Sequence, residues 1–155
     1  MKLEAIENGF VLYLKKFDMK GIDFDNLSEV EEYFRDILLR LKEYYCIDIT
    51  GFYNINVYID NLEGIVFRLE KEKIDYYSTF HHLEIRMVKE ETIFLYEVDD
   101  IFDLPLKEVE IYVYKDNLYV KRKCNERVFL LYEFGKLIYE NTSKIIDNGK
   151  RMTIF

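Results

Sequence analysis

The strongest hydrophobic pattern in the chain runs from Ser28 to Tyr45. Its apolar residues recur at steps of three and one, which places them on one face of a helix with about 3.6 residues per turn. Ser28 and Glu31 have the spacing of a capping box, so we expect Ser28 to cap the start of this helix. The apolar face, which we expect to pack across a β-sheet, consists of Val30, Tyr33, Phe34, Ile37, Leu38 and Leu41.

The segments on either side of this helix have the two-residue period of β-strands. Residues 6–16 carry apolar residues on both sides, which predicts a first strand that is covered on both faces for part of its length. A turn-rich connection, residues 18–26, leads into the helix. Residues 52–59 alternate, the loop 60–64 ends in glycine, and residues 65–69 return as the partner strand. Residues 6–70 are therefore predicted to form a β-α-β-β unit.

The second half is predicted to consist of β-hairpins followed by a C-terminal helix. Residues 83–88 alternate, residues 89–91 turn, and residues 92–98 return as a strand. The clearest hairpin joins residues 108–114 to residues 118–123. Asn125 is predicted to cap a second helix that runs to about Ile146 with Gly135 inside it, before a short edge strand at 152–155. The apolar side of that helix consists of Val128, Leu131, Tyr132, Ile138, Tyr139 and Ile145.

These patterns predict the α+β class, with a mainly antiparallel sheet and two helices. A chain of 155 residues with one proline and six glycines leaves little room for a long linker. The most plausible seam is residues 71–79, which begin with charged residues. We therefore expect a single compact domain over residues 1–155, either undivided or made of two packed halves, 1–72 and 80–155.

Net charge and cysteine content restrict the compartment and the partners. The net charge of −8 disfavours binding to nucleic acid, whose phosphates repel an acidic surface. Cys46 and Cys124 are too few for a disulfide framework, so we expect two free, partly buried thiols. The first four residues lack the basic-then-apolar order of a signal peptide, and apolar runs are too short for a membrane helix. We expect a cytoplasmic protein that contacts no membrane.

Candidate chemistry is sparse. The adjacent residues His81 and His82 would point to opposite faces of a strand, which disfavours a shared metal. Asp99, Asp100 and Asp103 could hold a hard cation but lack the spacing of a calcium loop, so a solvated turn is favoured. The cysteines and serines lack the flanking residues of known nucleophiles. We expect no cofactor, no metal and no enzymatic activity.

Several short segments resemble the competence adaptor protein MecA family. The opening LEAIENGFVLYL, the turn at Gly21–Asp25, the capped helix and the hairpin entered at Gly51 resemble the N-terminal part of that family. FLYEVDDIFDL (residues 94–104) and YEFGKLI (residues 132–138) resemble segments of its C-terminal domain. The resemblance implies an adaptor in which one half holds a client protein and the other docks on a Clp-type AAA+ unfoldase.

Three hypotheses of function follow. The first is a non-enzymatic protein-interaction module, rich in tyrosine, for which the resemblance implies the role of such an adaptor. Its partner would be bound by Glu97, Asp99, Asp100, Phe102, Asp103 and Leu104. The second is a small acidic inhibitor or mimic that occupies the basic surface of a nucleic-acid-binding protein. The third is an enzyme of unrecognised type that uses His81 or His82. The pattern of residues leaves the oligomeric state open.

Overall fold

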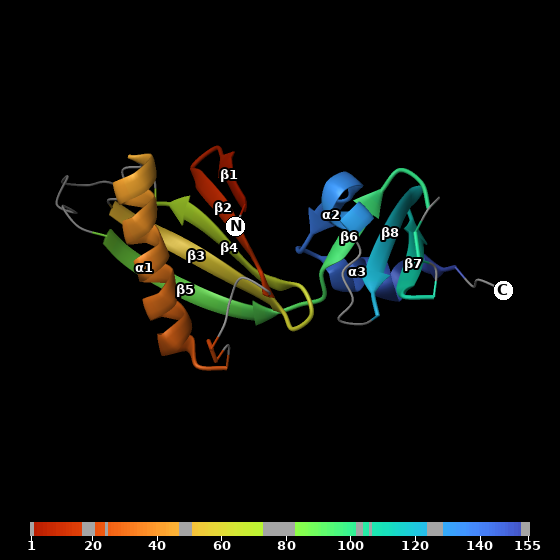
Figure 1. Cartoon of the computed structure of the whole chain (residues 1–155), viewed down its shortest axis with the longest axis horizontal. Helices are drawn as coiled ribbons and strands as arrows, with labels where there is room; N and C mark the ends of the chain where they lie inside the picture. Colours follow the sequence, from red (N-terminus) through yellow and green to blue (C-terminus); the bar gives the residue numbers. More distant parts are fainter. Residues whose placement is uncertain are drawn as a thin grey trace. The chain divides into compact units, whose positions relative to one another are not determined.

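The computed structural model forms two compact units (Figure 1). The first unit comprises Met1–Ile59 and Gly64–Glu90, and the second comprises Asp60–Glu63 and Glu91–Phe155. The structure describes residues 2–16, 21–23, 25–46, 51–72, 83–101, 104–105, 107–123 and 129–152. The predicted seam at 71–79 falls mostly outside these residues, and a single compact domain stays a prediction.

The first unit is built on a five-stranded sheet in the order β1-β2-β4-β3-β5. Its strands are β1 (Lys2–Ile6), β2 (Gly9–Lys15), β3 (Gly51–Asp60), β4 (Gly64–Lys71) and β5 (Leu83–Glu91). β2 pairs antiparallel with β1 on one side and with β4 on the other. All five residues from Phe10 to Leu14 are buried, so the prediction that this strand is covered on both faces is confirmed.

Two strand predictions in this unit are wrong. The predicted first strand, residues 6–16, is the second strand of a hairpin whose first strand is β1. Most of β1 is exposed, so burial does not impose a pattern of apolar residues on it, and the sequence predicted no strand there. The predicted pairing of residues 83–88 with 92–98 does not form, because β5 joins this sheet and residues 95–98 join the other. Alternation identifies a strand but not its neighbour.

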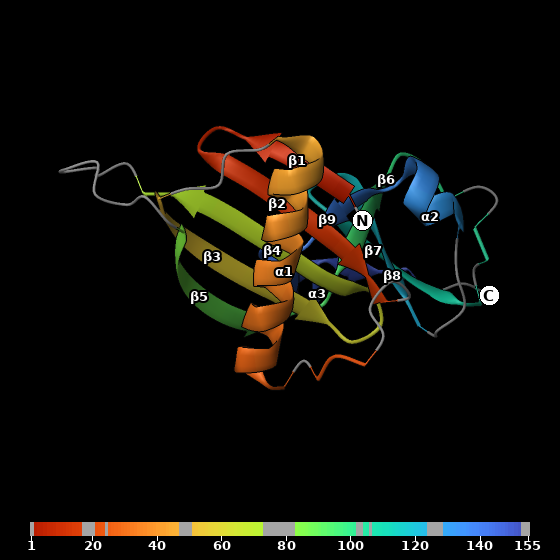
Figure 2. The ribbon, with the colours of Figure 1, turned by 60° about the vertical axis from the view of Figure 1, so that its left-hand side comes forward.

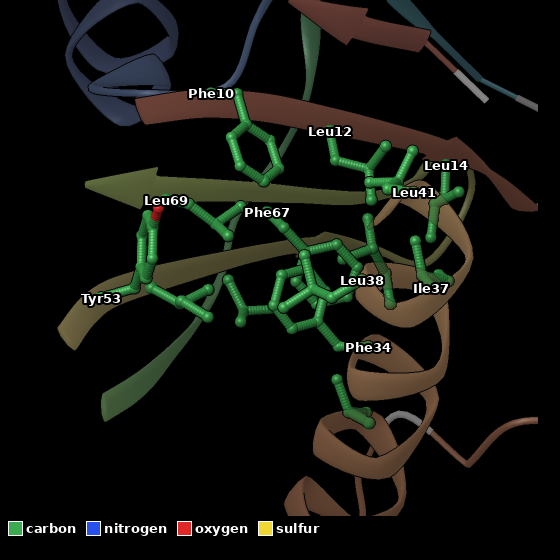
Figure 3. Close-up of a cluster of buried hydrophobic side chains, with 14 of the residues drawn as sticks. Phe10, Leu12, Leu14, Phe34, Ile37, Leu38, Leu41, Tyr53, Phe67 and Leu69 are labelled. Carbon is green, nitrogen blue, oxygen red and sulfur yellow. The ribbon is translucent and has the colours of Figure 1, made fainter. Parts of the chain in front are cut away.

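A single long helix, α1 (Leu27–Tyr45), packs across one face of this sheet (Figures 2 and 3). Phe34 is fully buried, and its ring stacks on Phe67 of β4 with the centroids 4.4 Å apart. Ile37, Leu38 and Leu41 are also buried, so the predicted apolar face is confirmed. They belong to one core cluster with side chains of β2, β3 and β4 (Figure 3).

The predicted start of α1 is wrong. The helix begins at Leu27, and its N-cap is Asn26, whose Oδ1 accepts a hydrogen bond from the backbone N–H of Glu29 at 3.4 Å. Ser28 therefore lies inside the first turn and does not cap the helix. Asparagine and serine are equally good caps, so the capping-box spacing could not decide between two candidates two residues apart.

The second unit has its own five-stranded sheet in the order β10-β7-β8-β6-β9. Its strands are β6 (Leu95–Val98), β7 (Val109–Tyr114), β8 (Asn117–Arg122), β9 (Lys136–Ile138) and β10 (Lys150–Arg151). The predicted β7–β8 hairpin is confirmed, with Tyr114 paired to Asn117. Lys115 and Asp116 both have positive φ, 47° and 64°, as a two-residue turn between antiparallel strands requires.

The predicted helix from Asn125 to Ile146 is wrong in its extent. The described residues contain two short helices, α2 (Phe129–Phe134) and α3 (Thr142–Asn148), with β9 between them. Helix α2 ends just before Gly135, where the chain passes very close to β6. A Cβ atom there would lie 2.6 Å from the carbonyl oxygen of Leu131 and 3.1 Å from the Cβ of Tyr96. Asn125 lies outside the described residues.

The two short helices cover opposite faces of the second sheet. Leu131 of α2 is buried in a cluster with Tyr96, Ile111 and Val120. Ile145 of α3 is buried in another, which consists of Leu95, Tyr112, Tyr119 and Ile145. The α+β class with mostly antiparallel sheets is confirmed. The described residues form three helices and ten strands, and no helix among them is long and apolar enough to cross a membrane.

The predicted edge strand at the C-terminal end lies slightly earlier than expected. β10 pairs antiparallel with β7 through Lys150 and Arg151, whereas the prediction placed the strand at 152–155. Residues 153–155 lie outside the described residues.

Candidate functional site

The predicted partner-binding residues lie at and beyond the end of β6. Asp99 and Asp100 follow the strand directly and are exposed. Glu97 lies on β6 and is half-buried. Leu104 is also half-buried and packs against the core cluster of the second unit. Phe102 and Asp103 lie outside the described residues.

The pairing of β6 with β9 brings the two sequence segments of interest together. Leu95 pairs with Ile138 and Glu97 pairs with Lys136 in an antiparallel register. Because the strands run in opposite directions, the end of α2 that precedes β9 lies beside the end of β6 that precedes Asp99 (Figure 1). Residues 94–100 and 132–138 therefore form one region of the second unit.

Phe134 is the prominent feature of this region. Its side chain is 73% exposed, which is unusual for a phenylalanine. Glu133, the preceding residue, is also exposed. We call Asp99, Asp100, Glu133 and Phe134 the acidic–aromatic surface. The sequence predicted Asp99 and Asp100 and missed Glu133 and Phe134, although Phe134 had fallen outside the predicted apolar side of its helix.

Four side chains form a closed ring of contacts within this unit, and we call them the buried polar ring. The Nε of Arg122 donates a hydrogen bond to Oε1 of Glu63, and the hydroxyl of Tyr96 donates to Oε2 of Glu63 at 2.8 Å. The guanidinium of Arg122 lies 5.8 Å from the ring centroid of Tyr132. The ring of Tyr132 meets that of Tyr96 edge-on, with the centroids 5.8 Å apart.

Both charged members of the buried polar ring are removed from solvent. Arg122 is 2% exposed and Glu63 is 4% exposed. Burial raises the pKa of Glu63 above its ordinary value and outweighs the opposing charge of Arg122. Burial alone would lower the pKa of Arg122, but the neighbouring carboxylate raises it, so the guanidinium stays charged.

The loop that carries Glu63 is held by the carboxylate of Asp60. Oδ1 of Asp60 accepts hydrogen bonds from the backbone N–H groups of Leu62 and Glu63, at 2.8 and 3.2 Å. Oδ2 accepts from the backbone N–H of Phe94 at 2.7 Å. The backbone carbonyl of Leu62 in turn accepts from Nη2 of Arg122 at 2.9 Å. A cavity of about 210 Å³ lies beside this loop, between Asp60, Thr92 and Lys121.

The sequence did not predict the buried polar ring, because its two charged members are far apart in the chain and look ordinary locally. One signal was available. Arg122 follows Leu118 and Val120 at two-residue steps, so it stands on the core-facing side of β8. A cation at such a position requires a buried partner.

The remaining candidate residues give little more. His81, His82 and Cys124 lie outside the described residues. Cys46 is a free thiol and is exposed, which corrects the prediction that it is partly buried. Within the described ranges, no group of three or more histidine, cysteine, aspartate or glutamate side chains is arranged to hold a metal ion.

Comparison with protein-family models, with curated proteins and with solved structures finds no match to this chain. The fold and the site define a two-unit α+β protein in which an exposed acidic–aromatic surface lies at one end of the second sheet.

Proposed function

We propose that this chain is a non-enzymatic, cytosolic protein-interaction module that binds a partner protein through the acidic–aromatic surface. The observation that supports this most strongly is the pairing of β6 with β9, which sets the exposed Phe134 beside the end of β6 where Asp99 and Asp100 follow. Large exposed aromatic side chains are over-represented among the residues that dominate binding energy at interfaces.

The side chains of this surface indicate which kind of partner surface would be complementary to it. Phe134 supplies apolar area that an apolar pocket on the partner could bury. Asp99, Asp100 and Glu133 carry negative charge around it, so the rim of that pocket should be basic. Rim charges mainly accelerate association, whereas a buried anchor slows dissociation.

The resemblance to the MecA family suggests which partner to test first. FLYEVDDIFDL and YEFGKLI, the two segments that carry the resemblance in the second half, are also the segments that contain the acidic–aromatic surface. In this proposal the second unit docks on a Clp-type AAA+ unfoldase, and the chain acts as an adaptor that delivers client proteins to it.

The direct test is a titration of the labelled protein against a purified Clp-type ATPase hexamer. Phe134→Ala should weaken binding roughly tenfold or more, mainly through faster dissociation. Asp99→Asn should mainly slow association and reduce its salt dependence. Leu39→Ala is the matched control, because Leu39 is also an exposed apolar side chain, 59% accessible, but lies on α1 in the first unit.

Two outcomes would contradict the proposal. Absence of binding by the unaltered protein ends the adaptor hypothesis for that partner. Equal losses for Phe134→Ala and Leu39→Ala would show that the acidic–aromatic surface is not where the partner binds. Binding to a basic nucleic-acid-binding protein that vanishes at moderate salt and is competed by nucleic acid would instead support an acidic inhibitor or mimic.

A further inference from the structure

We propose that Arg122 is a positioning residue for the acidic–aromatic surface: through its contact with Tyr132 it holds α2, and with it Phe134, in the geometry that a partner recognises. The effect of Arg122 on partner binding rests on the proposed function. The claim that Arg122 fixes the position of α2 rests only on the contacts of the buried polar ring. Arg122 itself is 2% exposed and lies too deep to touch a partner.

Helix α2 cannot hold its own position. It has six residues, and isolated helices shorter than about 12 residues are marginal in water. The β6–β9 pairing anchors the chain just after α2, and side-chain contacts must fix the helix itself on the sheet. Leu131 is fully buried in the core cluster, and Tyr132 lies against the guanidinium of Arg122. Leu131 supplies non-directional packing, whereas a cation over an aromatic face has a preferred geometry.

Arg122 is itself held firmly. Its planar guanidinium donates through Nε to Glu63 and through Nη2 to the carbonyl of Leu62, and two such bonds fix the plane of the group. Tyr96 links Glu63 back to Tyr132, which closes the ring. Movement of α2 would therefore disturb a contact of a buried cation that cannot lose its charge.

Desolvation of two buried charges offsets much of their attraction, and burial raises the pKa of Glu63 despite the nearby charge of Arg122. Burial of an ion pair can nevertheless favour one arrangement of segments over others. The buried polar ring joins one residue from each of four segments: the loop 60–63, β6, β8 and α2. Its main contribution is therefore to the position of α2.

The test compares Arg122→Met with Glu63→Gln in the full chain, by hydrogen exchange of the backbone amides. Arg122→Met removes the cation and leaves a carboxyl group that can neutralise itself by binding a proton. We expect exchange in residues 131–138 to accelerate roughly tenfold or more, with the β7–β8 amides unchanged. Glu63→Gln keeps an acceptor for Arg122 and should accelerate exchange in residues 131–138 much less.

A control separates local positioning from general loss of stability. Ile145→Ala removes buried side-chain volume on the opposite face of the same sheet, without touching the buried polar ring. Arg122→Met overturns the proposal if it leaves exchange in 131–138 unchanged, or if it raises exchange evenly over the unit as Ile145→Ala should. If Arg122→Met does not fold, Tyr132→Leu replaces it, and wild-type exchange in 131–138 in that variant also overturns the proposal.

Binding supplies the functional readout. Arg122→Met should weaken binding to the Clp-type ATPase roughly tenfold while the far-ultraviolet circular dichroism spectrum is retained. Faster exchange in 131–138 with unaltered affinity would show that Arg122 positions α2 but not the docking surface. Failure of the unaltered protein to bind is a different result: it contradicts the proposed function, and hydrogen exchange still decides the role of Arg122.

Discussion

Glu63 and Arg122 show how burial changes the effect of a charge on stability. A carboxylate in water has an ordinary pKa near 4.5, and the buried environment raises the pKa of Glu63 above this value in the folded unit. The folded state therefore binds the proton more tightly than the unfolded chain does. It follows that the free energy of unfolding rises as the pH falls through the raised pKa toward the ordinary one, and falls again as the pH rises.

Glu63→Gln should therefore be tolerated at neutral pH. The amide has no charge to desolvate, but it also removes the counter-charge of the buried Arg122. These two effects oppose each other, so we expect the free energy of unfolding to change by less than about 2 kcal/mol. The free energy of unfolding of Glu63→Gln minus that of the unaltered protein should become smaller as the pH falls from neutrality toward the ordinary carboxyl pKa of 4.5, because the unaltered protein gains stability as Glu63 binds its proton. Urea unfolding of both proteins at several pH values measures this.

A large loss of stability in Glu63→Gln would show that the attraction between Glu63 and Arg122 outweighs the cost of burying the carboxylate. If Glu63→Gln lowers the free energy of unfolding by about 3–5 kcal/mol at neutral pH, the attraction of Arg122 exceeds the cost of burial. The pKa of Glu63 would then be lowered in the folded state. The difference in free energy of unfolding between Glu63→Gln and the unaltered protein would change with pH in the opposite direction.

At the scale of elements, α1 gives a strict comparison between adjacent residues. Leu38 is 2% exposed and packs on the sheet, whereas Leu39 is 59% exposed. Leu38→Ala should lower the free energy of unfolding by roughly 2–5 kcal/mol, because it leaves a cavity in the core. Leu39→Ala changes the same side chain with no cavity and should shift it by less than about 0.5 kcal/mol. Thermal and urea unfolding measure the free energy of unfolding of both variants. Overlapping curves would show that packing of Leu38 on the sheet does not stabilise the unit.

The start of α1 gives a second comparison. Asn26→Ala removes the side-chain oxygen that accepts from the N–H of Glu29, so it should cost roughly 1 kcal/mol. Ser28→Ala should leave the free energy of unfolding unchanged or raise it by about 0.5 kcal/mol or less, because Ser28 lies inside the first turn, where alanine is the better helix former. Denaturant unfolding measures the free energy of unfolding of both variants. A larger decrease for Ser28→Ala than for Asn26→Ala would show that Ser28 is the N-cap after all.

The sequence predicted those elements whose signal is local. The apolar face of α1, the alternation of β3 and the β7–β8 turn each follow from residues within one helix turn or one hairpin of each other. It failed where two local signals competed, as at Asn26 and Ser28. It also failed where a distant contact decided the outcome. Gly135 was expected inside a helix, but α2 ends just before it, and β9, which pairs with the distant strand β6, begins just after it.

In the candidate site, too, the sequence predicted the local segments but not the contacts between distant ones. The acidic segment after β6 and the segment 132–138 could both be singled out from sequence, but their adjacency depends on the β6–β9 pairing. The buried polar ring depends on a bond between residues 59 positions apart, which no local pattern encodes. Exposure of Phe134 follows from where α2 ends, so it could not be predicted while α2 was taken for part of a longer helix.

At the scale of the whole molecule, the second unit is discontinuous in sequence. Residues 60–63 belong to it, although Asp60 is the last residue of β3 and residues 61–63 lead into β4 of the first sheet. They supply acceptors to buried donors of this unit. Glu63 and the carbonyl of Leu62 accept from Arg122, and Asp60 accepts from the N–H of Phe94. A cut in the chain at residue 90 would therefore separate the unit from part of its own core.

This discontinuity predicts that residues 91–155 alone do not fold cooperatively. Each buried donor left without an acceptor costs about 1–3 kcal/mol, and a chain of this size has only about 3–10 kcal/mol of stability. We expect the isolated fragment to show no sharp thermal transition by near-ultraviolet circular dichroism. The matched control is the same fragment carrying residues 60–63 on a flexible linker, which restores the acceptors and should recover a cooperative transition. If the two fragments melt alike, residues 60–63 contribute nothing that the second unit needs, and its boundary lies at residue 91.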